Sequence, residues 1–269
     1  MKIKLIYLLL ICLVLSACKT QKNQGNNEGF VTLFNGKNWD GWHLKIRSGD
    51  AEAAQKVFGI DKGLVHVFKD MPDSTDLNNG KNLTHGLFYT DKKYSMFIFK
   101  FEYKWGKKIT NNFSSFQYDA GLYYHVIDEA IWPKGIEYQV RYNHLKNKNH
   151  TGDFWGMPFK VWTADENKQF AFAQDGGKLQ AVRGGERLAK ATTNFNALDD
   201  KWNQCEVIVM GDKYAIHKLN GEVINVAYDL PVGEGTIGLQ SETAEVFYRN
   251  IKIKEFKEFV PIEKFLFKK

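Results

Sequence analysis

The chain has 269 residues, a formal net charge of +6 at pH 7 and an aromatic content of 14%. Its 37 basic residues are interleaved with 31 acidic ones, which is not the basic stripe of a nucleic-acid-binding protein, so we expect no nucleic-acid partner. The length suits one large β domain or two small ones, and the aromatic side chains provide both a large core and rings for stacking on sugars.

The N-terminus has the features of an export signal. Two lysines precede a short apolar run that ends in LSAC, which resembles a bacterial lipobox, so we interpret residues 1–17 as a lipoprotein signal peptide and Cys18 as the lipidated residue. Residues 18–28 are rich in Asn, Gln and Gly and predict a flexible tether. A plain secretory signal or a transmembrane anchor is the alternative, although the apolar run is short for a bilayer span. This interpretation predicts an exported protein, anchored by lipid to a membrane of the bacterial envelope, in the periplasm or at the outer membrane.

Beyond the tether, residues 49–57 have the composition of one or two helical turns, and strands are expected almost everywhere else. Residues 96–105 alternate strictly between aromatic and other side chains. The aromatic set is Phe97, Phe99, Phe101, Tyr103 and Trp105, and the opposite set includes Lys100, Glu102 and Lys104. Such alternation with a period of two predicts a half-buried strand.

Two further alternating runs lie in the middle of the chain. In residues 120–128 the pattern places Leu122, Tyr124 and Val126 opposite Tyr123 and His125. In residues 135–143, GIEYQVRYN, the inward set is Ile136, Tyr138, Val140 and Tyr142, and the polar set is Glu137, Gln139, Arg141 and Asn143. The polar row is either an ordinary wet face or the floor of a sugar-binding groove, and the period alone does not choose between them.

The last third of the chain contains a hairpin signal and one more strand. Asn220 and Gly221 separate two alternating runs, which predicts a tight β-hairpin. Residues 245–256 predict a strand that turns Phe247, Ile251 and Ile253 inward. Cys205 and His217 share the parity of apolar neighbours, so we interpret both as buried structural residues.

The pattern as a whole predicts an all-β fold. Helical periodicity is scarce, and several long alternating strands need a second sheet to cover their apolar faces. We therefore expect two antiparallel sheets packed as a jelly-roll β-sandwich over residues 29–258, followed by a C-terminal tail at residues 259–269.

Five blocks of sequence carry a family resemblance. GFVTLFNGKNWDGWH, GIEYQV, TGDFWGM, KWNQCEVIV followed by LNG, and IGLQSETAEVFYRNIKIKEF resemble the 3-keto-disaccharide hydrolase family, from about Gly29 to Phe256. The resemblance implies a sandwich similar to concanavalin A-like lectins and glucanases, bacterial export, and action on glycosides whose sugar is oxidised at C3. The chain departs from the family where His125 replaces a common Arg and where SET follows the LQ of the last block.

A carbohydrate substrate of this class can be cleaved by two routes. Ordinary hydrolysis places two carboxylates across the scissile bond. A 3-keto sugar has an acidic C2 proton, so a base can remove that proton, an electrophile can hold the enolate, and the aglycone can leave before water adds. A divalent metal ion would serve as that electrophile, but no paired histidines identify its ligands.

Three residues are candidates for catalysis. Glu137 is the first candidate for the base or for a metal ligand. The alternative is that Glu137 is a solvent-exposed residue that only forms an ion pair with Arg141. His125 has the parity of a polar-face residue and could relay a proton, although a lone histidine is more often structural. Glu242 lies two residues after Gln240, so on a strand the two side chains share one face, and Glu242 is the candidate for a second carboxylate. The alternative is an acidic residue in a turn at the end of the strand.

Six residues are candidates for contacting the sugar. They are Gln139, Arg141, Tyr123, Asp153, Trp155 and Gln240. Asp153 and Trp155 combine an acid with a ring that can stack on a sugar, and a turn acid beside core aromatics is the alternative. A carbohydrate-binding lipoprotein without catalysis is the rival interpretation, because it would use the same groove and rings. An envelope subunit that packs this groove on a protein partner is a third.

Overall fold

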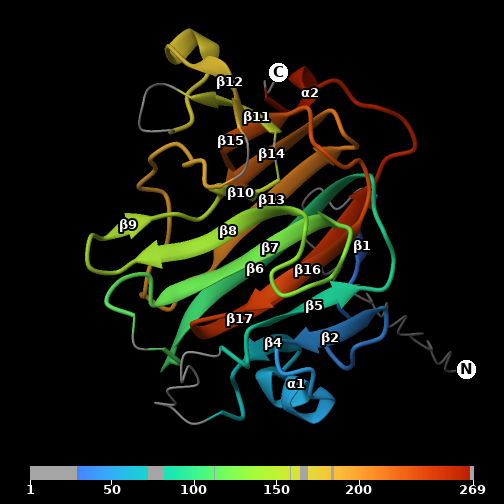
Figure 1. Cartoon of the computed structure of the whole chain (residues 1–269), viewed down its shortest axis with the longest axis vertical. Coiled ribbons are helices and arrows are strands. Elements are labelled where there is room, and N and C mark those ends of the chain that lie inside the picture. The colour runs from blue at the N-terminus through green and yellow to red at the C-terminus, as the bar shows by residue number, and fades with distance from the viewer. Residues whose placement is uncertain are drawn as a thin grey trace, which may run out of the picture.

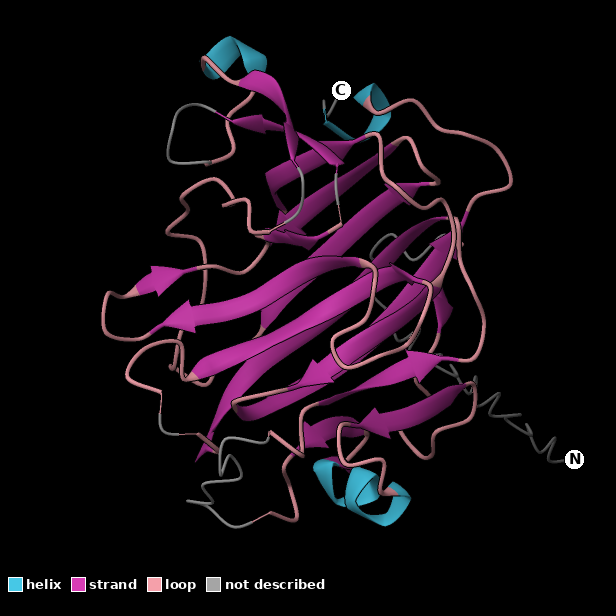
Figure 2. Cartoon of the chain, in the orientation of Figure 1, coloured by secondary structure: helices cyan, strands magenta, loops and turns pink. Residues whose placement is uncertain are grey.

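The computed structural model describes residues 29–71, 82–111, 113–157, 159–163, 169–182 and 185–266. The predicted signal peptide, the tether and Cys18 lie outside these residues. Within the described part, no helix is both long enough and apolar enough to cross a membrane. Strands cross the whole molecule, and short helices lie only at its periphery (Figures 1 and 2). The helices are α1 (Ala51–Val57), the 3₁₀ turn η1 (Ala173–Asp175) and α2 (Glu263–Leu266).

The strands form two antiparallel sheets. The large sheet has ten strands, in the order β12 (Lys178–Val182), β11 (Phe159–Thr163), β15 (Glu222–Tyr228), β14 (Tyr214–Leu219), β13 (Asn203–Met210), β6 (Met96–Ile109), β17 (Ala244–Glu255), β4 (Leu64–Val67) and β3 (Phe58–Asp61), with β1 (Val31–Thr32) paired to β17. The small sheet has seven strands, in the order β10 (Phe154–Gly156), β8 (Ile136–Asn143), β7 (Tyr118–Val126), β16 (Thr236–Ser241), β5 (Gly86–Thr90) and β2 (Trp42–Ile46), with β9 (Lys148–Asn149) paired to β8. The predicted all-β sandwich is confirmed.

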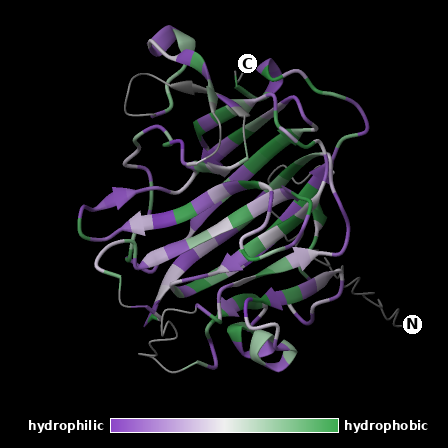
Figure 3. Cartoon of the chain, in the orientation of Figure 1, coloured by the Kyte–Doolittle hydropathy of each residue, from purple (hydrophilic) through white to green (hydrophobic). Residues whose placement is uncertain are grey.

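The hydrophobic core lies between the two sheets. In β6 the five aromatic side chains of the predicted inward set are buried, as the alternation of its sequence requires. In β8 the inward set is buried as well, and Ile136, Tyr138 and Val140 join the same core cluster. Apolar and polar residues alternate along these strands (Figure 3). Cys205 and His217 are buried in this interior, as predicted.

The hairpin between β14 and β15 forms where Asn220-Gly221 predicts it. Both residues have positive φ, 48° at Asn220 and 85° at Gly221, which a two-residue turn between twisted strands requires. The predicted helical turns also form as α1, where the side chain of Asp50 accepts a hydrogen bond from the backbone N–H of Ala53 at 3.0 Å and caps the first turn.

Two β-bulges overturn parts of the predicted inward sets, one near the end of β7 and one in the middle of β17. His125 has a φ of 51°, and the register between β7 and β16 shifts beside it, so Val126 joins the outward cluster of Leu87, Tyr89 and Tyr123 instead of the core. Asn250 has a φ of 52° at a similar register shift in β17. Before that bulge, Tyr248 faces the core, and Phe247 faces outward against His66, with ring centroids 4.2 Å apart. An extra residue in one strand reverses the alternation after it.

Candidate active site

The polar face of the small sheet is the face turned away from the large sheet. Leu122 and Tyr138 point into the core, so their strand neighbours Tyr123, Glu137 and Gln139 point to the polar face. The register places Glu137 between Tyr123 on β7 and Trp155 on β10. The predicted polar row therefore lies on one face, and it continues across neighbouring strands.

Glu137 and Gln240 meet above a glycine. Gly121 on β7 lies between their two strands, and a Cβ atom on it would stand 2.3 Å from Oε1 of Glu137 and 2.4 Å from Oε1 of Gln240. Only a residue without a side chain leaves room for both groups. Glu137 is 4% exposed and Gln240 is 1% exposed, and Oε1 of Gln240 has no hydrogen-bond partner among the described residues.

Three carboxyl groups gather on the polar face. Burial raises the pKa of Glu137 to about 8, the nearby Asp119 contributes to the increase, and a hydrogen bond from Tyr123 opposes it. Burial likewise raises the pKa of Asp119, against the charge of Arg141. Glu242, in the turn between β16 and β17, also has a raised pKa because of burial and of the charges of Asp119 and Glu137. A carboxyl group with a pKa near 8 is a strong base once it loses its proton.

Arg141 supplies positive charge beside these acids. It pairs with Asp119 across the β7–β8 register, with 3.9 Å from Nη1 to Oδ2, and it forms an ion pair with Glu186. Its guanidinium also lies 4.5 Å from the ring centroid of Phe116. Gln139 donates a hydrogen bond to Asp119. Arg141 and Gln139 thus hold Asp119 in place, in addition to any contact with a sugar.

Asp119 and Glu186 were not among the predicted site residues. Asp119 lies four residues before Tyr123 on the same strand, so its parity places it on the polar face, and this signal was present in the sequence. Glu186 lies in a loop, and its pairing with Arg141 depends on tertiary contacts that no local pattern encodes.

His125 does not join this group, which corrects its predicted place on the polar face. Its ring is fully buried, with 2.8 Å from Nδ1 to the carbonyl oxygen of Val232 and 3.1 Å from Nε2 to that of Ser95. The bulge at this residue turns the side chain away from the row of Glu137. Burial lowers the pKa of its imidazole. These contacts suit a residue that ties β7 to two loops.

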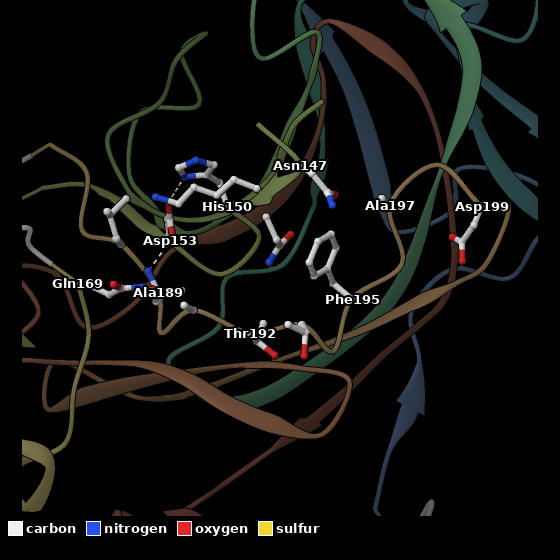
Figure 4. Close-up of a pocket in the computed structure, with 14 residues that line it drawn as sticks. Asn147, His150, Asp153, Gln169, Ala189, Thr192, Phe195, Ala197 and Asp199 are labelled. Carbon is white, nitrogen blue, oxygen red and sulfur yellow. Dashed lines mark hydrogen bonds and ion pairs between the residues drawn. The ribbon is translucent and has the colours of Figure 1, made fainter. Parts of the chain in front are cut away.

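Asp153 and Trp155 lie at the β10 edge of the small sheet, in different surroundings. Asp153 is buried, with its Oδ1 accepting from the backbone N–H of Ala189 at 2.6 Å and its Oδ2 2.9 Å from Nδ1 of His150. It lines a cavity of about 480 Å³, together with Gln169 and Phe195 among others (Figure 4). Glu137 does not line this cavity. Trp155, in contrast, is 42% exposed beside Glu137.

One group of side chains has donor types that suit a metal ion. His150, Asp153 and Glu186 each offer an atom, and these atoms lie within 4.8 Å of one another. In this arrangement, however, both oxygens of Asp153 are hydrogen-bonded, and Glu186 is paired with the guanidinium of Arg141. The carboxylates of Asp153 and Glu186 are therefore engaged within the protein, and a cation would have to compete with Arg141 for Glu186. We assign no catalytic step to a metal at this group.

Comparison with known sequences identifies the family. Residues 29–254 match the sequence profile of the 3-keto-alpha-glucoside-1,2-lyase-like domain. The chain belongs to this family. No curated protein matches the chain by sequence. The family predicted from the five blocks is confirmed, and the matched range spans the strands that carry the polar face.

Solved structures support the fold of this 3-keto-alpha-glucoside-1,2-lyase-like domain. A crystal structure of a candidate glycosyl hydrolase from Parabacteroides distasonis ATCC 8503 shares 20% identity, covers 86% of this chain and 95% of its own, and has a TM-score of 0.50. A second such structure from the same organism shares 16% identity, covers 84% of this chain and 99% of its own, and has a TM-score of 0.52. At these identities the likeness establishes the sandwich fold alone.

Proposed function

We propose that the protein is a glycoside-cleaving enzyme that acts on 3-keto glycosides, with Glu137 as the base. The observation that carries this proposal is the position of Glu137, a nearly buried carboxyl group above Gly121 with a pKa raised to about 8. Removal of a C2 proton next to a carbonyl needs one strong, shielded base. The family of the domain and the carbohydrate-related proteins that share its fold support the same class of substrate.

The reaction would proceed by elimination followed by addition of water. Glu137 takes the proton from C2, and the electrons of that C–H bond form the enolate of the C3 ketone. The enolate then collapses, the C1–O bond breaks, and the aglycone leaves as an alcohol after taking up a proton. Water adds to the resulting enone, which gives the free 3-keto sugar. The sum of these steps is a hydrolysis without any change in oxidation state.

Other side chains on the polar face have properties that suit supporting roles. Tyr123 has a pKa raised well above its usual value by burial and by Glu137, so its hydroxyl stays protonated and keeps the hydrogen bond that orients the carboxylate of Glu137. Arg141 supplies a permanent positive charge on the same face. The unpartnered Oε1 of Gln240 can accept a hydrogen bond from a sugar hydroxyl.

Product analysis by mass spectrometry tests the proposal. The purified domain is incubated with a 3-keto glycoside and with its unoxidised parent, with and without a chelator. We expect cleavage of the keto form only, and Glu137→Gln should abolish it while the fold is retained. Cleavage of both substrates would instead indicate hydrolysis by two carboxylates, and full activity of Glu137→Gln would exclude Glu137 as the base. Loss of activity with chelator would assign the electrophile to a metal ion.

A carbohydrate-binding protein without catalysis is the second candidate function. The exposed ring of Trp155 beside a polar face favours it, because binding modules stack such rings on sugars. This candidate predicts a shifted melting temperature with sugar and no product from either substrate. It also predicts that Glu137→Gln weakens binding only modestly, because a binding module has no rate to lose.

We also propose that the protein is a lipoprotein of the bacterial envelope, anchored through Cys18. The proposal rests on the LSAC sequence and on the polar tether that follows it. Expression in a bacterial host with labelled palmitate should label the wild type and fractionate it with membranes. Cys18→Ala should lose both the label and the membrane association, and a labelled Cys18→Ala protein would refute the assignment.

A further inference from the structure

The loop between β7 and β8 lies over the polar face, at the edge of the small sheet that β5 and β2 form. Tyr89 on β5 donates a hydrogen bond from its hydroxyl to the carbonyl oxygen of Ala130 at 3.0 Å. Glu129 lies 3.0 Å from Nε2 of His43 on β2. Ile131 packs against the outward apolar cluster that contains Tyr89. Three contacts of different kinds therefore fix the position of this loop.

The loop presents Trp132 beside two polar side chains. The ring of Trp132 lies 5.3 Å from the ring of His85, and the guanidinium of Arg47 lies 5.5 Å from its centroid. Trp132 is still 37% exposed, so part of its ring is open to a ligand. An indole that is held by two neighbours and partly exposed provides a rigid surface on which a sugar ring can stack.

His85 adds an unsatisfied polar atom to this group. Its side chain is buried, and its Nδ1 has no hydrogen-bond partner among the described residues. A buried polar atom without a partner is costly, so a ligand that supplies a hydroxyl group there gains binding energy. Arg47 adds guanidinium N–H donors at the surface and interacts electrostatically with Glu242 of the acidic group.

The position of this group relative to Glu137 suggests the size of the ligand. Trp155 lies on β10 at one edge of the small sheet, and His85 and Arg47 lie beside β5 and β2 at the other, with the acids between them. From β8, which carries Glu137, to β5 is three strand spacings, roughly 14 Å. That distance suits a short oligosaccharide better than a single sugar ring.

We infer that Trp132, His85 and Arg47 form a second sugar subsite, which binds the leaving group of the glycoside as a hexopyranose ring. The inference rests on the proposed function, because the leaving group is defined by cleavage next to Glu137. The substrate would then be a disaccharide or a longer glycan. Its oxidised ring would lie between Trp155 and the acids, and its second ring would stack on Trp132.

The test compares two substrates that differ only in the leaving group. These are a 3-keto disaccharide of two glucose units and the 3-keto methyl glucoside, and the readout is the ratio of their kcat/KM values. We expect Trp132→Ala to lower the preference for the disaccharide by about fivefold to tenfold, the scale of one aromatic stacking contact. Trp132→Phe should restore most of the preference. Trp202→Ala is the matched control, because Trp202 contacts Arg249 and Lys104 of the large sheet, and it should leave the ratio unchanged.

The outcomes separate the subsite from the proposed function. An unchanged ratio in Trp132→Ala, or an equal loss on both substrates, would overturn the subsite while the proposed function stands. If the wild type cleaves neither substrate, the proposed function fails, and calorimetric titration with the unoxidised disaccharide and methyl glucoside decides the subsite alone. Tighter binding of the disaccharide that disappears in Trp132→Ala would then support the subsite, and equal binding would refute it.

Discussion

Oε1 of Glu137 lies directly above Gly121, where a Cβ atom would approach it to 2.3 Å. The same Cβ would meet Oε1 of Gln240, so Gly121→Ala should displace both side chains from the polar face. We expect about a hundredfold loss of kcat/KM on a 3-keto glycoside, because small displacements of a catalytic group are costly. Gly233→Ala is the matched control, since its Cβ meets only ordinary contacts of 3.4 Å or more. Equal activity of the two variants would show that Glu137 is not held in a catalytic position by this contact.

Asp119 should set the pH dependence of the reaction. Its negative charge contributes to the raised pKa of Glu137, and a base works only when deprotonated, so kcat/KM of the wild type should rise with pH through a midpoint near 8. Asp119→Asn removes that charge and should move the midpoint to lower pH, by about one unit or less. A pH–rate profile of both proteins measures this shift. A midpoint that stays in place or moves upward would contradict the assigned coupling.

Glu137 should make the fold less stable as the pH rises. Its pKa is about 8 in the folded protein and 4.5 without the fold, so between these values the unfolded chain loses a proton that the folded chain keeps. Stability therefore falls as the pH rises from 4.5 towards 8, and this contribution is constant above that range. Glu137→Gln lacks this titration, so it should be more stable than the wild type at alkaline pH, on the order of a few kcal/mol, with little difference near pH 4.5.

Chemical denaturation of the wild type and Glu137→Gln at both pH values measures this effect. The comparison also serves as the folding control for the activity assay, because an inactive variant that is more stable than the wild type cannot have lost its rate through unfolding. A Glu137→Gln variant that is less stable than the wild type at every pH would show that burial does not disfavour the ionised carboxylate of Glu137.

His217 should contribute to acid unfolding. Burial between the sheets lowers its pKa to about 3, while the unfolded value is 6.5, so the unfolded chain takes up a proton first as the pH falls. The stability that the neutral ring contributes is thus fully present above pH 6.5 and is lost progressively as the pH falls towards 3. His217→Gln should be less stable at neutral pH by roughly 1–3 kcal/mol, because the ring contacts Tyr124 and the carbonyl of Gly152, but its stability should decrease less on acidification. Thermal unfolding curves from neutral to acidic pH measure both effects, and equal acid sensitivity would contradict the prediction.

Much of the fold follows from local patterns in the chain. In β6 alternation predicts which side chains are buried, because one face of the strand packs on the core. In β8 it predicts which side chains face the core, but the polar row on the other face is buried as well, except for Arg141. Asn220-Gly221 predicts its hairpin because few other residue pairs tolerate positive φ at both positions. These predictions succeed where local conformation and burial agree.

The same patterns fail where the backbone departs from regular geometry. The bulges at His125 and Asn250 reverse the alternation. His and Asn adopt positive φ more often than most residues, but that preference does not identify which His or Asn forms a bulge. The row that contains Glu137 therefore lies on one face, as predicted, whereas His125 lies elsewhere than predicted, and the catalytic and sugar-binding roles stay predictions. The acidic group could not be predicted in full, because the proximity of Glu242 to Asp119 depends on the order of the strands in the sheet.

The bulge at His125 affects the loop that lies over the polar face. By adding one residue to β7, it turns Val126 outward into the cluster on which Ile131 rests, and this places the loop of Trp132 over the sheet. The row of Glu137 lies on β8, opposite the regular part of β7 that precedes the bulge. Removal of that one residue should thus shift the loop without moving Glu137, so under the proposed function the choice of glycoside can change while the cleavage step stays the same.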